Sequence, residues 1–223
     1  MEALAVFGKT QCTKYLLLQK IWVNIISITA FKNKKIKKDY KYMRIITGDF
    51  KGRRLEMPEN NNIRPTTEKV KEAIFSIIAG NLEDAVCVDL FAGTGNLGLE
   101  ALSRGAKRCY FGDNSRESLA LIKRNIEMCR AEEWSVVIPG DFEKVLTRLG
   151  EKGEKIDIFF LDPPYKKGLY ERCFELIREY NLLADDGIII AEHNVRDSLE
   201  DEICGFEKIK ERSYGTVAIS IYG

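Results

Sequence analysis

Histidine is nearly absent from the sequence, since His193 is the only one, and none of the six cysteines forms a C-x-x-C pair. Structural zinc sites are built from cysteine and histidine at short spacing, so a zinc site is disfavoured. Cysteines scattered in this way are typical of free thiols in a reducing cytosol. We therefore expect a cytoplasmic protein without a metal site.

A long uninterrupted hydrophobic segment is also missing. Residues 15–31 are apolar enough to suggest a signal peptide or a membrane anchor, but Gln19, Lys20 and Asn24 interrupt them. A membrane-spanning helix needs about 20 predominantly apolar residues, and a signal peptide needs a small-residue cleavage site, which does not follow here. Export and membrane anchoring are therefore disfavoured.

The overall charge of +1 hides a strong asymmetry along the chain. Residues 1–42 hold nine lysines against Glu2 and Asp39, a net charge of +7, which leaves −6 for residues 43–223. We interpret residues 1–42 as a basic extension that is poorly ordered or arises from an upstream start site, with Met43 as the natural start. Because the remaining body is acidic, binding of nucleic acid would need a local basic patch.

Residues 43–80 predict a hairpin followed by a helix. Two partly apolar runs around a turn with Asp and Gly predict the hairpin over 44–57. In the helix, Thr66 or Thr67 can provide the cap, the apolar positions 70, 74, 77 and 78 share one face, and Gly80 marks the end.

Residues 81–223 alternate between apolar strands and amphipathic helices. Strands that are apolar throughout are typical of a parallel sheet covered by helices on both faces, so we expect an α/β fold. The last segment, 206–223, reads instead as an antiparallel hairpin at the edge of the sheet. The expected strands are 85–91, 109–113, 135–139, 156–161 and 187–193, and the expected helices are 96–105, 117–129, 142–149 and 169–180.

The first core strand runs into the glycine-rich stretch "DLFAGTGNLG" (89–98), in which we call residues 91–95 the glycine turn. The pattern G-x-G-x-x-G at the start of a helix is typical of nucleotide-type ligands, although a turn without a ligand gives the same pattern. Asp89 lies before the turn, where a carboxylate suits an ammonium group better than a phosphate. Asp113 follows 24 residues later, near the spacing at which an acid accepts hydrogen bonds from ribose hydroxyls.

A second motif, "LDPPY" (161–165), ends another buried strand. The two prolines fix the backbone and lack N–H donors, so Asp162 and the Pro163 carbonyl can both accept hydrogen bonds while Tyr165 offers an aromatic plane. This combination suits a planar base that carries an exocyclic amine. An ordinary turn with a partly exposed tyrosine is the alternative.

In order, "MRIITGDFKGRRL", "RPTTEKVKEAIF", "DLFAGTGNLGLEALSRGAK", "LDPPYKKGLYE" and "EH" resemble the RsmD family of bacterial 16S ribosomal RNA guanine-N2 methyltransferases, which use S-adenosylmethionine. The resemblance spans residues 43–223 and leaves out 1–42. It implies a Rossmann-like class I methyltransferase with a mostly parallel seven-stranded sheet, and a monomer that acts on 16S rRNA or on small-subunit particles.

The resemblance also implies roles for individual residues. Those expected to surround the cofactor are Asp89, Phe91, Gly93, Gly95, Asp113, Asp141 and Phe142. Those expected to hold the target guanine are Asp162, Pro163, Pro164 and Tyr165. Those expected to contact RNA near the mouth of the cleft are Lys51, Arg53, Arg54, Arg64, Thr66, Thr67, Lys166 and Lys167.

Three other interpretations stay open from the residues themselves. A nicotinamide-dependent oxidoreductase would share the glycine turn and Asp113, but it gives no reason for the Asp-Pro-Pro-Tyr motif. A non-catalytic RNA-binding module would bind RNA without turnover. An adenine-N6 methyltransferase acting on DNA or RNA is chemically nearest, because the same motif can hold either amine.

Overall fold

The computed structural model describes residues 43–58, 68–164 and 168–223. These residues belong to one compact unit, Met43–Gly223. The expectations for residues 1–42 and for the helix cap at Thr66 or Thr67 lie outside the described residues. Within the described ranges, no helix is both long enough and apolar enough to cross a membrane.

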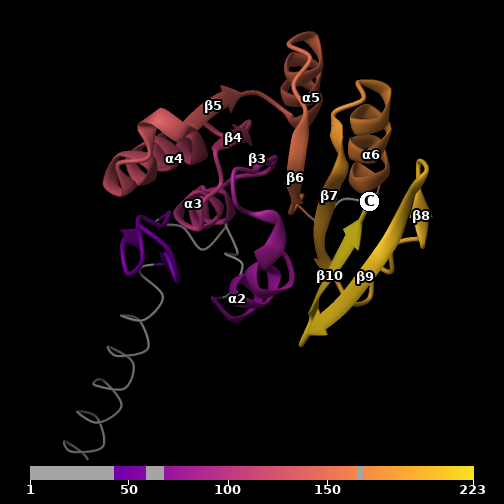
Figure 1. The fold of residues 1–223 in the computed structure, drawn as a ribbon, viewed down its shortest axis with the longest axis horizontal. Coiled ribbons are helices and arrows are strands. Elements are labelled where there is room, and N and C mark those ends of the chain that lie inside the picture. The colour runs from indigo at the N-terminus through magenta and orange to yellow at the C-terminus, as the bar shows by residue number, and fades with distance from the viewer. Residues whose placement is uncertain (1–42, 59–67, 165–167) are drawn as a thin grey trace, which may run out of the picture. The chain divides into compact units, whose positions relative to one another are not determined.

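The order of helices and strands follows the sequence pattern closely (Figure 1). Two short strands, β1 and β2, form the predicted N-terminal hairpin. The bounds are β1 Met43–Arg44, β2 Arg54–Leu55, α2 Glu68–Ile77, β3 Val86–Asp89, α3 Asn96–Ser103, β4 Arg108–Asp113, α4 Arg116–Cys129, β5 Ser135–Pro139, α5 Phe142–Glu151, β6 Ile156–Leu161, α6 Leu169–Glu179, β7 Leu183–Asn194, β8 Glu202–Ile203, β9 Phe206–Tyr214 and β10 Val217–Tyr222.

The central sheet has the order β5-β4-β3-β6-β7-β10-β9-β8. Its strands are parallel from β5 to β7, and β10 and β9 follow antiparallel, as the sequence predicts. The two-residue strand β8 is an addition, which makes eight strands rather than the expected seven. A strand this short leaves no apolar alternation to detect in the sequence.

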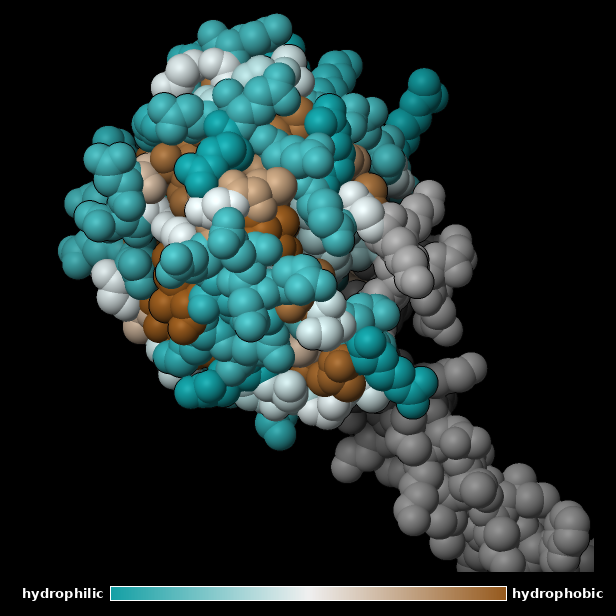
Figure 2. Space-filling model, turned by 90° about the vertical axis from the view of Figure 1, so that its right-hand side faces the viewer, coloured by the Kyte–Doolittle hydropathy of each residue, from teal (hydrophilic) through white to brown (hydrophobic). Residues whose placement is uncertain are grey.

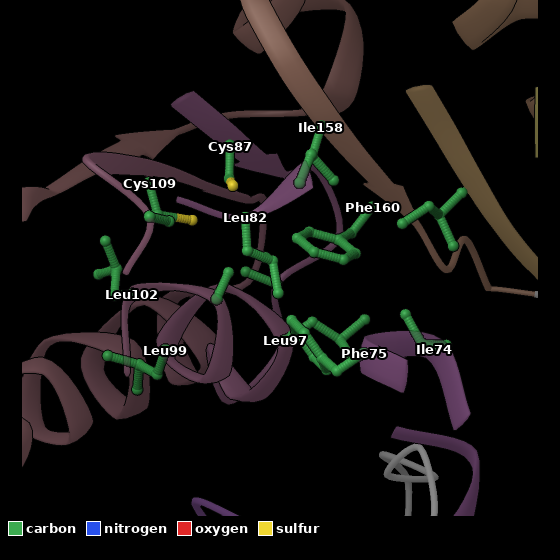
Figure 3. Close-up of a cluster of buried hydrophobic side chains, with 14 of the residues drawn as sticks. Ile74, Phe75, Leu82, Cys87, Leu97, Leu99, Leu102, Cys109, Ile158 and Phe160 are labelled. Carbon is green, nitrogen blue, oxygen red and sulfur yellow. The ribbon is translucent and has the colours of Figure 1, made fainter. Parts of the chain in front are cut away.

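Helices cover both faces of the sheet. One buried cluster joins α2, α3 and α4 to the sheet, and another joins α5 and α6 to it. In the first cluster the rings of Phe75 and Phe160 lie 5.7 Å apart between centroids (Figure 3). The buried side of α2 contains Ile74 and Phe75, whereas Ile77 is half-buried. Val70, Ile74 and Ile78 are buried as the sequence predicts, and Ile77 packs against the same cluster. The helix ends at Ile77, before a short turn that includes Gly80.

The strand next to the far edge, β9, is exposed over most of its length and carries both acidic and basic residues. Among the described residues, only the two-residue β8 pairs with its outer side. Charged side chains on such an edge oppose pairing with other chains. Figure 2 views this side of the molecule and shows mainly hydrophilic residues with scattered hydrophobic ones.

Gly98 allows α3 to pack tightly on β4. A Cβ atom at this position would lie 2.3 Å from Cε1 of Phe111 and 2.6 Å from Sγ of Cys109. We expect Gly98→Ala to lower the free energy of unfolding by about 1–3 kcal/mol because of this overpacking. Urea unfolding measures the change. The control is Gly80→Ala, where a Cβ would meet nothing within 4 Å; equal losses in the two variants would contradict the packing argument.

Candidate active site

Three aspartates lie at the carboxyl ends of three neighbouring strands. Asp89 is the last residue of β3 and pairs in register with Phe111 of β4 and Phe160 of β6. Asp113 and Asp162 come two residues after these partners. In the sheet, β3 lies between β4, which follows it in the chain, and β6, which begins the other half of the sheet. The strand order therefore reverses at β3, and open α/β sheets bind ligands at such a topological switch point.

The glycine turn has a backbone that requires glycine at two positions. Gly93 and Gly95 have φ of +55° and +77°, in the left-handed region that favours glycine. The Gly93 N–H donates to Oδ2 of Asp113 at 2.9 Å, and the Gly95 N–H donates to the Ala92 carbonyl at 2.6 Å. The turn is therefore held against the end of β4, and α3 begins directly after it.

The carboxyl group of Asp89 is almost completely buried, with 4% of the residue exposed. Its Oδ2 accepts a hydrogen bond from the Gly98 N–H at 3.0 Å. Burial raises the pKa of Asp89 to about 7; the Gly98 N–H opposes this shift, and the charge of Asp113 adds to it. A carboxyl in this state would gain from a cationic ligand group that holds it ionised.

Asp113 is half-buried, and both of its carboxylate oxygens accept backbone hydrogen bonds. Oδ2 accepts from Gly93, and Oδ1 accepts from Ser115 at 2.8 Å. Because a carboxylate has about four acceptor positions, Asp113 keeps capacity for hydroxyl donors such as those of a ribose. The Asp113 carbonyl also accepts from the Gly140 N–H at 3.0 Å, which brings the end of β5 to the same place.

Asp141 and Phe142 lie where β5 leads into α5. Asp141 is exposed and caps α5 by accepting from the Lys144 N–H at 2.9 Å. The ring of Phe142 lies 5.8 Å from that of Phe91, so an aromatic pair borders this end of the site. A helix-capping role alone would also explain an aspartate at position 141.

The Asp-Pro-Pro stretch directly follows Leu161, which is the last residue of β6. Asp162 is half-buried, Pro163 is buried and Pro164 is exposed. The remaining predicted residues of this loop, Tyr165, Lys166 and Lys167, lie outside the described residues, and so do Arg64, Thr66 and Thr67.

The neighbouring strand β7 carries His193 near its end, and the side chain of this histidine is buried. The residue is 3% exposed, and its Nε2 lies 2.9 Å from Oγ of Ser220 on β10. The Ser220 hydroxyl in turn donates to Glu211 on β9 at 2.9 Å. This histidine therefore links the three strands at the antiparallel side of the sheet.

The basic tip of the hairpin is bound at the end of α3 and near the end of α4. The Asp49 N–H donates to the carbonyl of Ser103, the last residue of α3, at 2.8 Å. Nη1 of Arg53 donates to the Met128 carbonyl near the end of α4 at 3.3 Å. Since the glycine turn precedes the first residue of α3, this eight-residue helix separates the two by about 12 Å. Lys51 and Arg54 are exposed and Arg53 is half-buried at this position.

The sequence analysis missed a buried polar cluster under the glycine turn. Lys71 and Glu100 are fully buried and form an ion pair of 2.9 Å, and Nζ of Lys71 also donates to Oδ1 of Asn96 at 2.8 Å. The sequence contains one sign of this cluster, which is a charged residue, Lys71, on an otherwise apolar face of α2. Lys71 shares its face with Ile74 and Phe75.

Comparisons with known proteins give one consistent result. The family model described as "Conserved hypothetical protein 95" matches residues 43–223. "Ribosomal RNA small subunit methyltransferase D" of Escherichia coli K12 is 34% identical over 180 residues, which cover 81% of this chain and 89% of that protein. The protein of the same name from Haemophilus influenzae is 30% identical and covers 81% of this chain and 93% of its own length.

A solved structure agrees with these sequence relatives. The structure described as "Putative methyltransferase yhhF from Escherichia coli" matches with a TM-score of 0.73 and 32% identity, and the match covers 81% of this chain and 97% of that one. The predicted Rossmann-like α/β fold is thereby confirmed. With a family model that covers all described residues, the chain belongs to the RsmD family of methyltransferases.

Proposed function

We propose that this protein transfers a methyl group from S-adenosylmethionine to the exocyclic N2 of a guanine in 16S rRNA of the small ribosomal subunit. The observation that carries the proposal is the placement of Asp89, Asp113 and Asp162 at the carboxyl ends of three adjacent strands, with the glycine turn bound to Asp113. The named relatives are small-subunit rRNA methyltransferases, which supports the same substrate class.

The described residues fit the cofactor group by group. Asp89, buried and with a raised pKa, would hold the ammonium group, and Asp113 would accept from the ribose hydroxyls. Asp141 and the aromatic pair of Phe91 and Phe142 would lie beside the adenine. When bound, S-adenosylmethionine supplies an electrophilic methyl group on a sulfonium centre.

The substrate side of the site follows from the Asp-Pro-Pro motif. Asp162 and the Pro163 carbonyl would accept from the amine of guanine, Pro164 would keep the loop rigid, and Tyr165 would stack on the base. These contacts orient the nitrogen lone pair for attack and stabilise the positive charge that develops there. The nitrogen loses its proton after transfer, so no catalytic group with a strongly shifted pKa is needed. The target nucleotide must be unpaired or flipped out.

Contact with RNA would extend well beyond the reacting base. Phosphates away from the reacting base would be bound at the hairpin tip by Lys51, Arg53 and Arg54. These residues would act as a local basic patch on an otherwise acidic body. Arg64, Thr66, Thr67, Lys166 and Lys167 would add further contacts with the RNA. We propose that the enzyme acts as a monomer in the cytoplasm, where ribosomes are assembled.

Cofactor affinity should depend on pH through Asp89. Because the pKa of Asp89 in the folded protein is about 7, most of this carboxyl is protonated at pH 6 and cannot hold an ammonium group. We expect Kd for S-adenosylmethionine to be about eightfold higher at pH 6.0 than at pH 7.5, measured by calorimetry. The same shift makes the folded state bind more protons than the unfolded state between about pH 4 and 7, so stability should fall across that window as pH rises. An affinity that does not change between the two pH values would contradict the role of Asp89.

The proposed function is tested by transfer of labelled methyl groups from S-adenosylmethionine. The substrates are 16S rRNA and small-subunit particles from cells that lack this modification, with fully modified particles as the control. We expect label in at least one unmodified substrate and none in the control. Cofactor binding without transfer to either substrate would contradict the assigned substrate class, and RNA binding with no cofactor binding would favour a non-catalytic RNA-binding module.

A further inference from the structure

Buried charges join the N-terminal hairpin and α2 to α3. Lys71 of α2 and Glu100 of α3 both have fully buried side chains, and Nζ lies 2.9 Å from Oε2. Burying two charges carries a large desolvation penalty, so stability alone is a weak reason for such a pair. A role in fixing the geometry of neighbouring elements is a better-founded explanation.

The ammonium group of Lys71 has a partner for each of its three protons. It donates to the Arg44 carbonyl of β1 at 2.7 Å, to Oδ1 of Asn96 at 2.8 Å and to Glu100. Lysine offers three donors and no acceptor, so the group is fully used. Burial lowers the pKa of Lys71, and the charge of Glu100 opposes that shift. One side chain therefore ties together the hairpin, α2 and the first turn of α3.

Glu100 completes the connection from the other side. Its Oε2 accepts from the Ile46 N–H at 2.8 Å, and its Oε1 accepts from the Thr47 N–H at 3.0 Å and from Nε of Arg104 at 2.9 Å. The hairpin backbone is thus bound to the middle of α3. If Lys71 is removed, Glu100 keeps three donors, so the fold has a means to survive the change.

Asn96 brings this cluster to the edge of the cofactor site. It is the first residue of α3 and directly follows Gly95 of the glycine turn. The residue is 6% exposed, and within the described protein its Nδ2 has no hydrogen-bond partner. The contact with Lys71 therefore determines which way the side-chain amide faces and helps to fix where α3 starts.

We propose that Lys71 is a positioning residue for the cofactor site, acting through Asn96 and Glu100 to hold the glycine turn and α2 in the geometry that binds S-adenosylmethionine. This inference rests on the proposed function. It explains why a buried lysine occupies an apolar helix face whose other members, Val70, Ile74 and Phe75, are hydrophobic.

The test compares Lys71→Met, Lys71→Arg and Asn96→Ala by calorimetric cofactor binding, steady-state kinetics and thermal unfolding. We expect Lys71→Met to raise Kd and KM for S-adenosylmethionine about tenfold with kcat within about threefold of wild type, and Lys71→Arg to restore most of the affinity. Asn96→Ala keeps the ion pair and should also raise Kd several-fold. The matched control is Glu68→Gln, which removes an exposed 3.0 Å ion pair between α2 and Arg44 of β1. This variant should change neither Kd nor KM.

The outcomes separate this inference from the proposed function. Wild-type protein that binds no S-adenosylmethionine would overturn the proposed function and this inference with it. Wild-type binding together with unchanged Kd in Lys71→Met, even at a lower melting temperature, would overturn the positioning role alone. If Lys71→Met does not fold, wild-type affinity in Asn96→Ala would overturn it in the same way.

Discussion

Replacing Asp162 by alanine should reduce the turnover number at least about a thousandfold while S-adenosylmethionine affinity stays within about threefold of wild type. The residue directly follows Leu161, the last residue of β6, and it is half-buried. Removal of its carboxylate takes away both the orientation of the amine and the stabilisation of the charge that develops on nitrogen. The affinity should persist because Asp89, Asp113 and the glycine turn remain intact.

This expectation is measured by single-turnover methyl transfer together with calorimetric cofactor binding. Asp185→Ala is the control, because Asp185 is an exposed acid on β7 outside the proposed site. Turnover within tenfold of wild type in Asp162→Ala would show that the carboxylate does not hold the amine. Loss of cofactor binding in the same variant would instead place Asp162 on the cofactor side of the cleft.

Replacing Asp89 by asparagine should weaken cofactor binding without weakening the fold. A hydrogen bond to a charged group contributes about 1.5–3 kcal/mol, which corresponds to an increase in Kd of roughly 10- to 150-fold. The asparagine Oδ1 can still accept from the Gly98 N–H, which now donates to Asp89 at 3.0 Å. The change also removes a buried acid whose pKa is raised to about 7, so the melting temperature near pH 7.5 should not fall.

This second prediction is tested by calorimetric measurement of Kd for S-adenosylmethionine at pH 6.0 and pH 7.5. In Asp89→Asn the pH dependence of Kd should be lost, because the group that titrates near pH 7 is gone. Wild-type affinity in the variant would contradict the assignment of Asp89 to the ammonium group. Weak binding that still varies with pH would assign the titration to a different group.

Local patterns explain why so much of this fold could be predicted. The parallel strands are continuous apolar runs, which the sequence shows directly. The glycine turn and the Asp-Pro-Pro motif restrict the backbone through their own residues, so the positions of these two motifs after β3 and β6 follow from the sequence. The caps of α4 and α5 are equally local, although the sequence analysis did not predict them. Ser115 and Asp141 each accept from the backbone N–H three residues on.

The features that escaped prediction depend on contacts between distant parts of the chain. Lys71 and Glu100 are 29 positions apart, and neither residue's neighbours in sequence reveal its partner. The anchor of the hairpin tip is equally distant in sequence, because the Asp49 N–H donates to the carbonyl of Ser103 at the end of α3. Gly112 is a third case, because a Cβ added there would lie 3.0 Å from Cγ2 of Val145 and 3.1 Å from the Leu90 carbonyl oxygen, and the sequence alone reveals neither contact.

The product nucleoside decides the reaction that we assign to this protein. Unmodified 16S rRNA and small-subunit particles are incubated with the full chain and S-adenosylmethionine, digested to nucleosides and analysed by mass spectrometry against standards. We predict N2-methylguanosine from at least one of the two substrates, and none with Asp162→Ala. N6-methyladenosine in its place would contradict the guanine assignment and make the enzyme an adenine-N6 methyltransferase of the same fold.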